Sequence, residues 1–71
     1  MYDFSEALKL LKQGDKMTLF EFEYPYYFTF TEPNTFWVHH IYDDEKNKLD
    51  EFRTSEILSD KWIIYKGTRK Y

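Results

Sequence analysis

The sequence contains no cysteine, only two glycines and only two prolines in its 71 residues. Without thiols it has no disulfide framework and no thiolate metal site, which suits a reducing compartment. Two distant glycines do not form the glycine-rich loop that cradles phosphates. A run of about 18 apolar residues, the length of a membrane-spanning helix, is lacking, as is a secretory signal. We therefore expect one small cytoplasmic domain over residues 1–71, with no membrane partner.

Aromatic residues, in contrast, are abundant: seven phenylalanines, seven tyrosines and two tryptophans make up 23% of the chain. Most of them lie between residues 20 and 42. A chain of this size buries only about 60% of its unfolded surface, so its stability must come from large ring contacts or from partner chains. The net charge of −3 argues against a general duplex nucleic-acid binder.

Pro25 and Pro33 divide the aromatic stretch into three predicted strands, residues 17–23, 26–31 and 36–42, because proline favours strand ends and edges. The third strand is largely apolar on both faces. One face suits packing under a helix, and the other needs a second layer, a partner chain or a ligand. We expect a homo-oligomer whose interface uses this second aromatic face. The alternative is that these rings are ordinary half-exposed surface.

The first predicted element is a helix over residues 2–14. Asp3 is its candidate N-cap, and Glu6 completes a capping-box pattern. One apolar stripe follows the helical period and comprises Phe4, Ala7, Leu8 and Leu11. Gly14 suits the left-handed conformation that ends a helix. This helix is expected to cover the sheet.

The second half of the chain is predicted from charge and capping signals. Residues 43–48 are expected to form a charged loop and residues 49–52 a short fourth strand. Thr54 or Ser55 is expected to cap a single helical turn with Leu58 buried, before a last strand over residues 61–66. The predicted fold class is α+β: an N-terminal helix packed on a bent antiparallel sheet, with a short second helix before the last strand.

Catalytic and metal-binding motifs are not evident. His39 and His40 are adjacent, so on a strand they face opposite ways and do not share one metal ion. The sequence has no nucleophile elbow, and nothing singles out a carboxylate pair. We expect a protein that is not an enzyme, with no catalytic residues, metal or cofactor. A histidine with a carboxylate partner is the feature to examine first.

Two segments carry a further pattern. The first runs Phe4-Ser-Glu-Ala-Leu-Lys-Leu-Leu-Lys-Gln-Gly-Asp-Lys-Met17, a helix, a glycine and a basic residue leading into a strand. The second runs Thr54-Ser-Glu-Ile-Leu-Ser-Asp-Lys-Trp-Ile-Ile-Tyr65, a short helix, an aspartate near a tryptophan, and a last strand. In this order and separation, the segments resemble the Thoeris anti-defence type-two family of small phage proteins. Residues 18–22 lack the arginine, glycine and tryptophan that members often carry.

The resemblance implies an oligomeric phage protein of the host cytoplasm that sequesters a cyclic nucleotide immune signal without cleaving it. The signal would be a cyclic ADP-ribose isomer or a cyclic oligonucleotide. On that expectation, Tyr27 and Trp37 are candidate stacking residues, Arg53 and Lys66 candidate phosphate partners, and Asp60 a candidate acceptor for ribose or base. Alternatively, Trp37 belongs to the core, Asp60 is a local cap and the cations are solvated surface. The alternative function is a protein-interaction module that inhibits a host protein through an exposed aromatic face.

Overall fold

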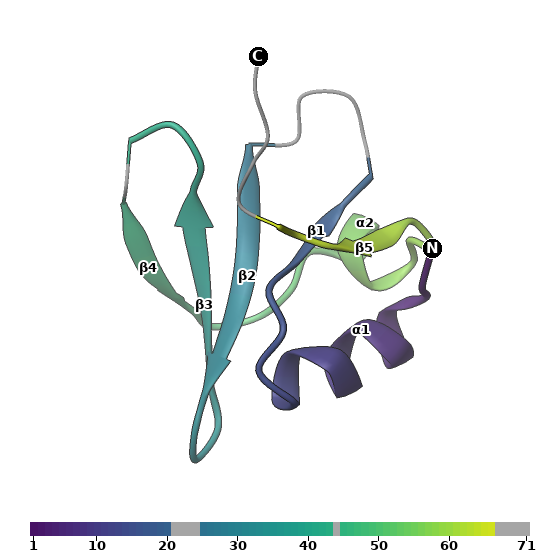
Figure 1. The fold of residues 1–71 in the computed structure, drawn as a ribbon, viewed down its shortest axis with the longest axis horizontal. Coiled ribbons are helices and arrows are strands. Elements are labelled where there is room, and N and C mark those ends of the chain that lie inside the picture. The colour runs from purple at the N-terminus through teal and green to yellow at the C-terminus, as the bar shows by residue number, and fades with distance from the viewer. Residues whose placement is uncertain (21–24, 44, 67–71) are drawn as a thin grey trace.

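The computed structural model describes residues 1–20, 25–43 and 45–66, which form a helix-and-sheet fold (Figure 1). In chain order the elements are α1 (Phe4–Lys12), β1 (Met17–Leu19), β2 (Tyr26–Thr31), β3 (Thr35–His40), β4 (Lys46–Leu49), α2 (Thr54–Ile57) and β5 (Trp62–Ile64). All strand pairs are antiparallel. The predicted α+β class is therefore confirmed, with the first helix on the sheet and the short second helix before the last strand.

The sheet has the strand order β4-β3-β2-β1-β5. β2 and β3 pair along their whole length, from Tyr26↔His40 to Thr31↔Thr35. β1 and β2 share only the pair Met17↔Phe28, and at this junction β1 and β5 turn away from the direction of the other strands (Figure 1). The sheet therefore bends around α1, as predicted. Backbone bonds between Tyr2 and Trp62, at 2.8 and 3.0 Å, tie the N-terminus to β5.

Local signals determine both ends of α1. The Asp3 carboxylate accepts a 2.8 Å bond from the Glu6 N–H, and the Glu6 carboxylate accepts one of 3.2 Å from the Asp3 N–H. This is the predicted capping box. The helix ends before Gly14, whose φ of 103° is in the left-handed region. Of the apolar stripe, Ala7 and Leu11 are fully buried, while Phe4 and Leu8 are half-buried at its edge.

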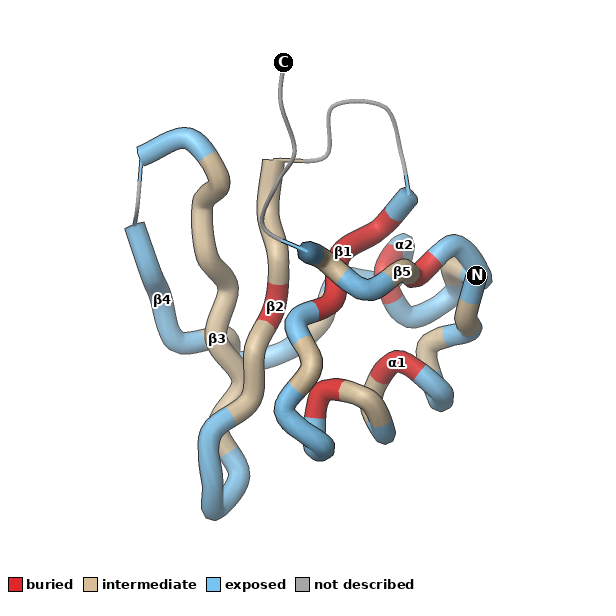
Figure 2. The backbone as a smooth tube through the Cα atoms, in the orientation of Figure 1, coloured by how far each residue is buried: buried red, intermediate tan, exposed pale blue. Residues whose placement is uncertain are grey.

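The core is built from rings as well as aliphatic side chains. Trp62 and Phe28 are almost completely buried, and their ring centroids lie 5.4 Å apart. Phe52 lies 5.4 Å from Phe28, and the Trp62 indole N–H donates a 3.0 Å bond to the Glu56 carbonyl. Figure 2 shows the buried positions on α1, β1, α2, β5 and the middle of β2, but not on β3 or β4. The core thus lies on the helix side of the sheet.

The strand predictions succeed for β2 and fail near β4. The bounds of β2 are those predicted, whereas β3 ends at His40 and leaves residues 41–42 in a turn. Residues 21–23 of the predicted first strand lie outside the described residues. The predicted loop 43–48 and strand 49–52 are wrong in part, because residues 46–49 form β4. An edge strand tolerates lysines, which discourage pairing with other chains, so its charge did not mark it as a strand.

The second helix also departs from the prediction. Its N-cap is Arg53, so Thr54 is already helical and neither Thr54 nor Ser55 is the cap. The Arg53 N–H donates a 2.8 Å bond to the Glu56 carboxylate, and Glu56 is 4% exposed. Leu58, predicted to be buried, is 77% exposed. A single helical turn has no repeating stripe, so its inward side was not readable from the sequence.

Candidate functional site

One face of the sheet is covered by the helices, and the other is the candidate site. Because strand side chains alternate, the registers place one set of side chains on the face opposite the core. This open face comprises Lys16, Thr18, Tyr27, Thr29, Thr31, Thr35, Trp37, His39, Lys46, Lys48, Ile63 and Tyr65. Of these residues Thr18 is fully buried. The Tyr65 N–H donates a 2.7 Å bond to the Lys16 carbonyl, which extends the β1–β5 pairing beyond β5.

Three rings of the open face form a continuous stack. The Tyr27 ring lies 4.5 Å from the His39 ring at an interplanar angle of 6°, and 4.3 Å from the Tyr65 ring at 13°. His39 is also joined to Thr29, through a 2.8 Å contact between Nε2 and Oγ1. With His39 and Tyr65 both stacked on its ring, Tyr27 offers no free face to a base in this conformation. Its candidate role as a stacking platform would require one neighbour to move.

Trp37 is the better placed platform on the open face. Its indole N–H donates a 2.8 Å bond to the Thr31 hydroxyl, which fixes the ring, and Lys46 Nζ lies 4.6 Å from the ring centroid. An exposed cation–π contact contributes about 0.5–1 kcal/mol. A stacked base contributes about 1–3 kcal/mol. A base that displaced Lys46 would therefore gain free energy and would leave an ammonium group beside it for a phosphate.

The charge of the open face is positive although the whole chain is acidic. Lys46 and Lys48 lie on β4, and Lys16 Nζ lies 5.6 Å from the Tyr27 ring centroid. Among the described residues assigned to this face, none is acidic. Burial lowers the pKa of His39, and the charges of Lys46 and Lys16 lower it further. The imidazole is therefore neutral at pH 7 and lies between two cations, Lys16 and Lys46. The described part of this face gives these cations no carboxylate partner.

A cleft of about 210 Å³ opens on the helix side of the sheet. Its lining consists of Tyr26, Phe28, Val38, His40, Leu49, Glu51, Arg53 and Glu56. His40 Nδ1 lies 3.5 Å from a carboxylate oxygen of Asp43, so the two adjacent histidines do face opposite ways, and this is the histidine–carboxylate pair to examine. Among the residues that the structure describes, the cleft lining includes no serine, threonine or cysteine to act as nucleophile. Its volume is below the roughly 300–1,000 Å³ of sites for drug-sized ligands.

The five candidate residues from the sequence therefore do not form one cluster. Tyr27 and Trp37 share the open face, whereas Arg53 lines the helix-side cleft. Lys66 is exposed just after Tyr65. Asp60 is in the turn between α2 and β5, on the far side of the molecule from β3 and β4 (Figure 1).

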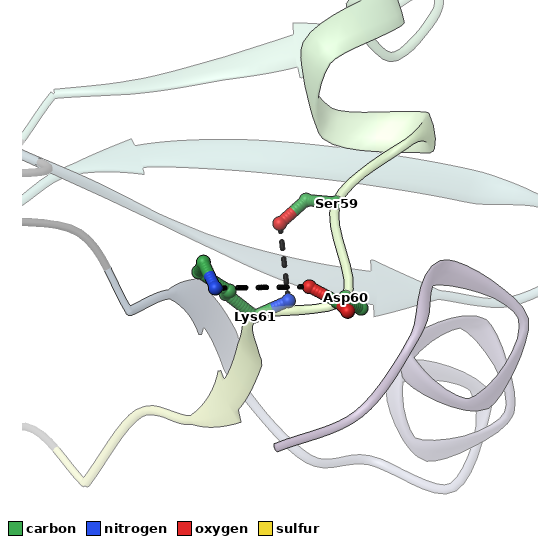
Figure 3. A network of polar contacts seen from close by, with 3 residues as sticks. All are labelled: Ser59, Asp60 and Lys61. Carbon is green, nitrogen blue, oxygen red and sulfur yellow. Dashed lines mark hydrogen bonds and ion pairs between the residues drawn. The ribbon is translucent and has the colours of Figure 1, made fainter.

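The surroundings of Asp60 are local. Figure 3 shows its carboxylate near Lys61 Nζ, at 3.9 Å, while the Lys61 N–H donates a 3.1 Å bond to the Ser59 hydroxyl. The Asp60 side chain is 83% exposed. Such an exposed pair stabilises a protein by roughly 0–1 kcal/mol. The turn therefore gives no sign that Asp60 is held in place for a ligand.

Sequence reasoning missed His39, Tyr65 and the three lysines of the open face. Strand alternation had already placed His39 on the same side of its strand as Trp37. The cross-strand register that brings it onto Tyr27, and the return of the chain after β5 that adds Tyr65, are tertiary features. A search for lysines at alternate strand positions would have found Lys46 and Lys48 only if β4 had been recognised.

Comparison with known proteins gave no match to a family model, to a curated protein or to a solved structure. Within residues 1–20, 25–43 and 45–66, no group of three or more histidine, cysteine, aspartate or glutamate side chains is placed to hold a metal ion. No helix in this part of the chain is long and apolar enough to cross a membrane. The chemistry of the open face is therefore the main indication of what the protein binds.

Proposed function

We propose that this protein binds a nucleotide-derived ligand on its open face and sequesters it without cleaving it. The observation that carries the proposal is the combination of Trp37 with Lys16, Lys46 and Lys48 on a face without acidic residues among those described. Aromatic rings stack on bases, and lysines pair with phosphates. The resemblance to the phage anti-defence family favours a cyclic immune signal as the ligand.

An open face alone encloses little of a ligand, whereas sequestration requires tight binding. Small-molecule sites usually bury 70–90% of the ligand surface. Two copies whose open faces meet would enclose a nucleotide between two sets of rings and cations. We therefore propose a homo-oligomer whose interface includes the open face and encloses the ligand.

The oligomeric state is directly measurable. We expect sedimentation velocity at micromolar concentration to give a dimer or a larger species, because the rings of β3 face both ways on a chain of marginal size. Reversing the charge of Lys46 and Lys48 places carboxylates at this interface and should change the distribution of species. A monomer at all concentrations, with and without cyclic nucleotides, would rule out the enclosed arrangement.

Sequestration predicts that bound ligand is recovered intact. The protein is incubated with cyclic ADP-ribose isomers and cyclic oligonucleotides and filtered, and the filtrate is assayed for activation of a signal-responsive effector. We expect one ligand to be depleted, then released on heating with unchanged mass and full activity. A linearised or hydrolysed product would instead show that the protein is an enzyme that cleaves the ligand.

Charge reversals provide the matched controls for this assay. Lys46→Glu/Lys48→Glu changes the open face and should abolish depletion. Lys9→Glu/Lys12→Glu makes the same change in net charge at exposed positions of α1 and should leave depletion intact. Equal loss in both variants would indicate only a general effect of charge.

The alternative, a module that inhibits a host protein, has its own structural support. A groove of about 380 Å³ on the helix side is lined mostly by apolar side chains: Phe4, Leu8, Lys12, Phe36, Leu49, Asp50, Glu51, Phe52 and Ile57. Exposed apolar surface of this kind is typical of protein interfaces. If no cyclic nucleotide is retained and a host protein is captured only when Ile57 is intact, this function replaces the first.

A further inference from the structure

The open face contains one titratable group that lies between its cations. His39 on β3 is stacked on Tyr27 of β2, and it forms a hydrogen bond with Thr29, which is also on β2. Lys46, its cross-strand partner on β4, and Lys16, before β1, both act on its charge. Beyond Tyr27 the next ring is Tyr65, after β5. None of these neighbours is a carboxylate.

We propose that binding of a phosphate-bearing ligand to the open face is coupled to protonation of His39, so that the face binds such anions more tightly as the pH falls. The inference rests on the proposed function only in using the same site. It requires an anionic group between the lysines and does not depend on which base the ligand carries. His39 takes up a proton when the phosphate group binds.

The sign of the coupling follows from the environment of the imidazole. In the free protein, burial and the two lysines hold the pKa of His39 below its ordinary value, so the ring is neutral at pH 7. An anion between Lys16 and Lys46 offsets their positive charge and itself attracts a proton to the ring, so the bound form has the higher pKa. Affinity then rises as pH falls from the bound-state pKa to the free-state pKa, and is constant outside that window.

The hydrogen bond to Thr29 does not oppose this protonation. The Nε2–Oγ1 distance of 2.8 Å fits either direction of donation, because a threonine hydroxyl both donates and accepts. Neutral His39 with an unprotonated Nε2 accepts from the hydroxyl, and the imidazolium donates to it. The ring therefore keeps its position on Tyr27 while its charge changes.

The test follows both histidines of the full chain by NMR of their ring protons between pH 5 and 8. The probe is inorganic sulfate, which stays dianionic throughout, and sodium chloride holds the ionic strength constant so that screening of the lysines is equal. We expect saturating sulfate to raise the pKa of His39 by about 0.5–1, below the roughly 1–3 that a close, unscreened charge produces. His40, on the opposite face beside Asp43, is the internal control and should move much less.

Variants separate the coupling from a general salt effect. Lys46→Gln should raise the pKa of His39 without sulfate and reduce the further rise on adding it, whereas Lys9→Gln on α1 should do neither. An equal rise for both histidines, or perturbation of the open face by sulfate with an unchanged His39, would overturn the proposal, and so would the absence of any sulfate effect. A rise confined to His39 when no cyclic nucleotide is retained would leave the coupling standing and remove only the proposed function.

Discussion

Replacing Trp62 by alanine is expected to lower the free energy of unfolding by about 3–5 kcal/mol, the usual cost of deleting a buried large ring. Trp62 is fully buried, and its ring lies 5.4 Å from that of Phe28 and 5.9 Å from that of Phe4. The substitution also leaves the Glu56 carbonyl without the 3.0 Å bond from the indole N–H. At about 0.05–0.15 kcal/mol per residue, the whole domain is stable by roughly 4–10 kcal/mol. The loss therefore takes much or all of that stability.

Chemical denaturation at one fixed protein concentration measures this effect, since an oligomer's stability depends on concentration. Leu58→Ala is the matched control because Leu58 is 77% exposed, and its effect should stay within about 0.5 kcal/mol. Trp62→Phe keeps a ring but loses the hydrogen bond to the Glu56 carbonyl. Its loss of unfolding free energy should therefore lie between those of Leu58→Ala and Trp62→Ala. A loss of less than about 1 kcal/mol for Trp62→Ala would mean that the core is not centred on this ring.

Elements with strong local signals were predictable from the sequence. The capping box of α1 joins residues three apart, so Asp3 and Glu6 identify it without knowledge of the fold. Gly14 ends the same helix for an equally local reason. The bounds of β2 follow from Pro25 before it and the turn that contains Pro33 after it.

Elements that depend on tertiary pairing were not predictable. β4 is a strand because it pairs with β3, through contacts such as Trp37↔Lys48 and Val38↔Asn47, and its own sequence has the composition of a loop. The inward side of α2 is chosen by the Glu56 carboxylate, which bonds to the Arg53 N–H. The buried Glu56 and the exposed Leu58 reverse the usual hydrophobic pattern. The sequence therefore predicted, wrongly, that Leu58 is the buried residue.

The candidate site shows the same division. Sequence alternation correctly separated His39 from His40. The two candidate stacking rings, Tyr27 and Trp37, do share the open face. It did not show that Tyr27 is stacked between His39 and Tyr65, because that arrangement needs the register of β2 with β3 and the position of the chain after β5. The cations nearest to Trp37 come from β4, so they were missed together with that strand.

Trp37→Ala is expected to weaken binding of the sequestered ligand by about 1–3 kcal/mol, the contribution of one stacked base. This corresponds to a roughly 5- to 150-fold higher dissociation constant. Trp37 is half-buried, and the groups that hold its ring are the Thr31 hydroxyl and the Lys46 ammonium, both at the surface. The fold should therefore survive the substitution, whereas the platform is lost.

Isothermal titration with the nucleotide retained in the depletion assay measures the loss, and the unfolding midpoint of the same sample reports on the fold. Trp37→Phe keeps an aromatic face and should retain most of the affinity. Ile57→Ala, on the helix side, removes exposed apolar surface away from the open face and should bind the nucleotide as the unmodified chain does.

Unfolding of Trp37→Ala would place Trp37 in the core. Unchanged affinity in a folded Trp37→Ala would move the stacking role to another ring, and Tyr65 would then be the first to test, because His39 already covers one side of Tyr27 and Tyr65 closes the stack on the other.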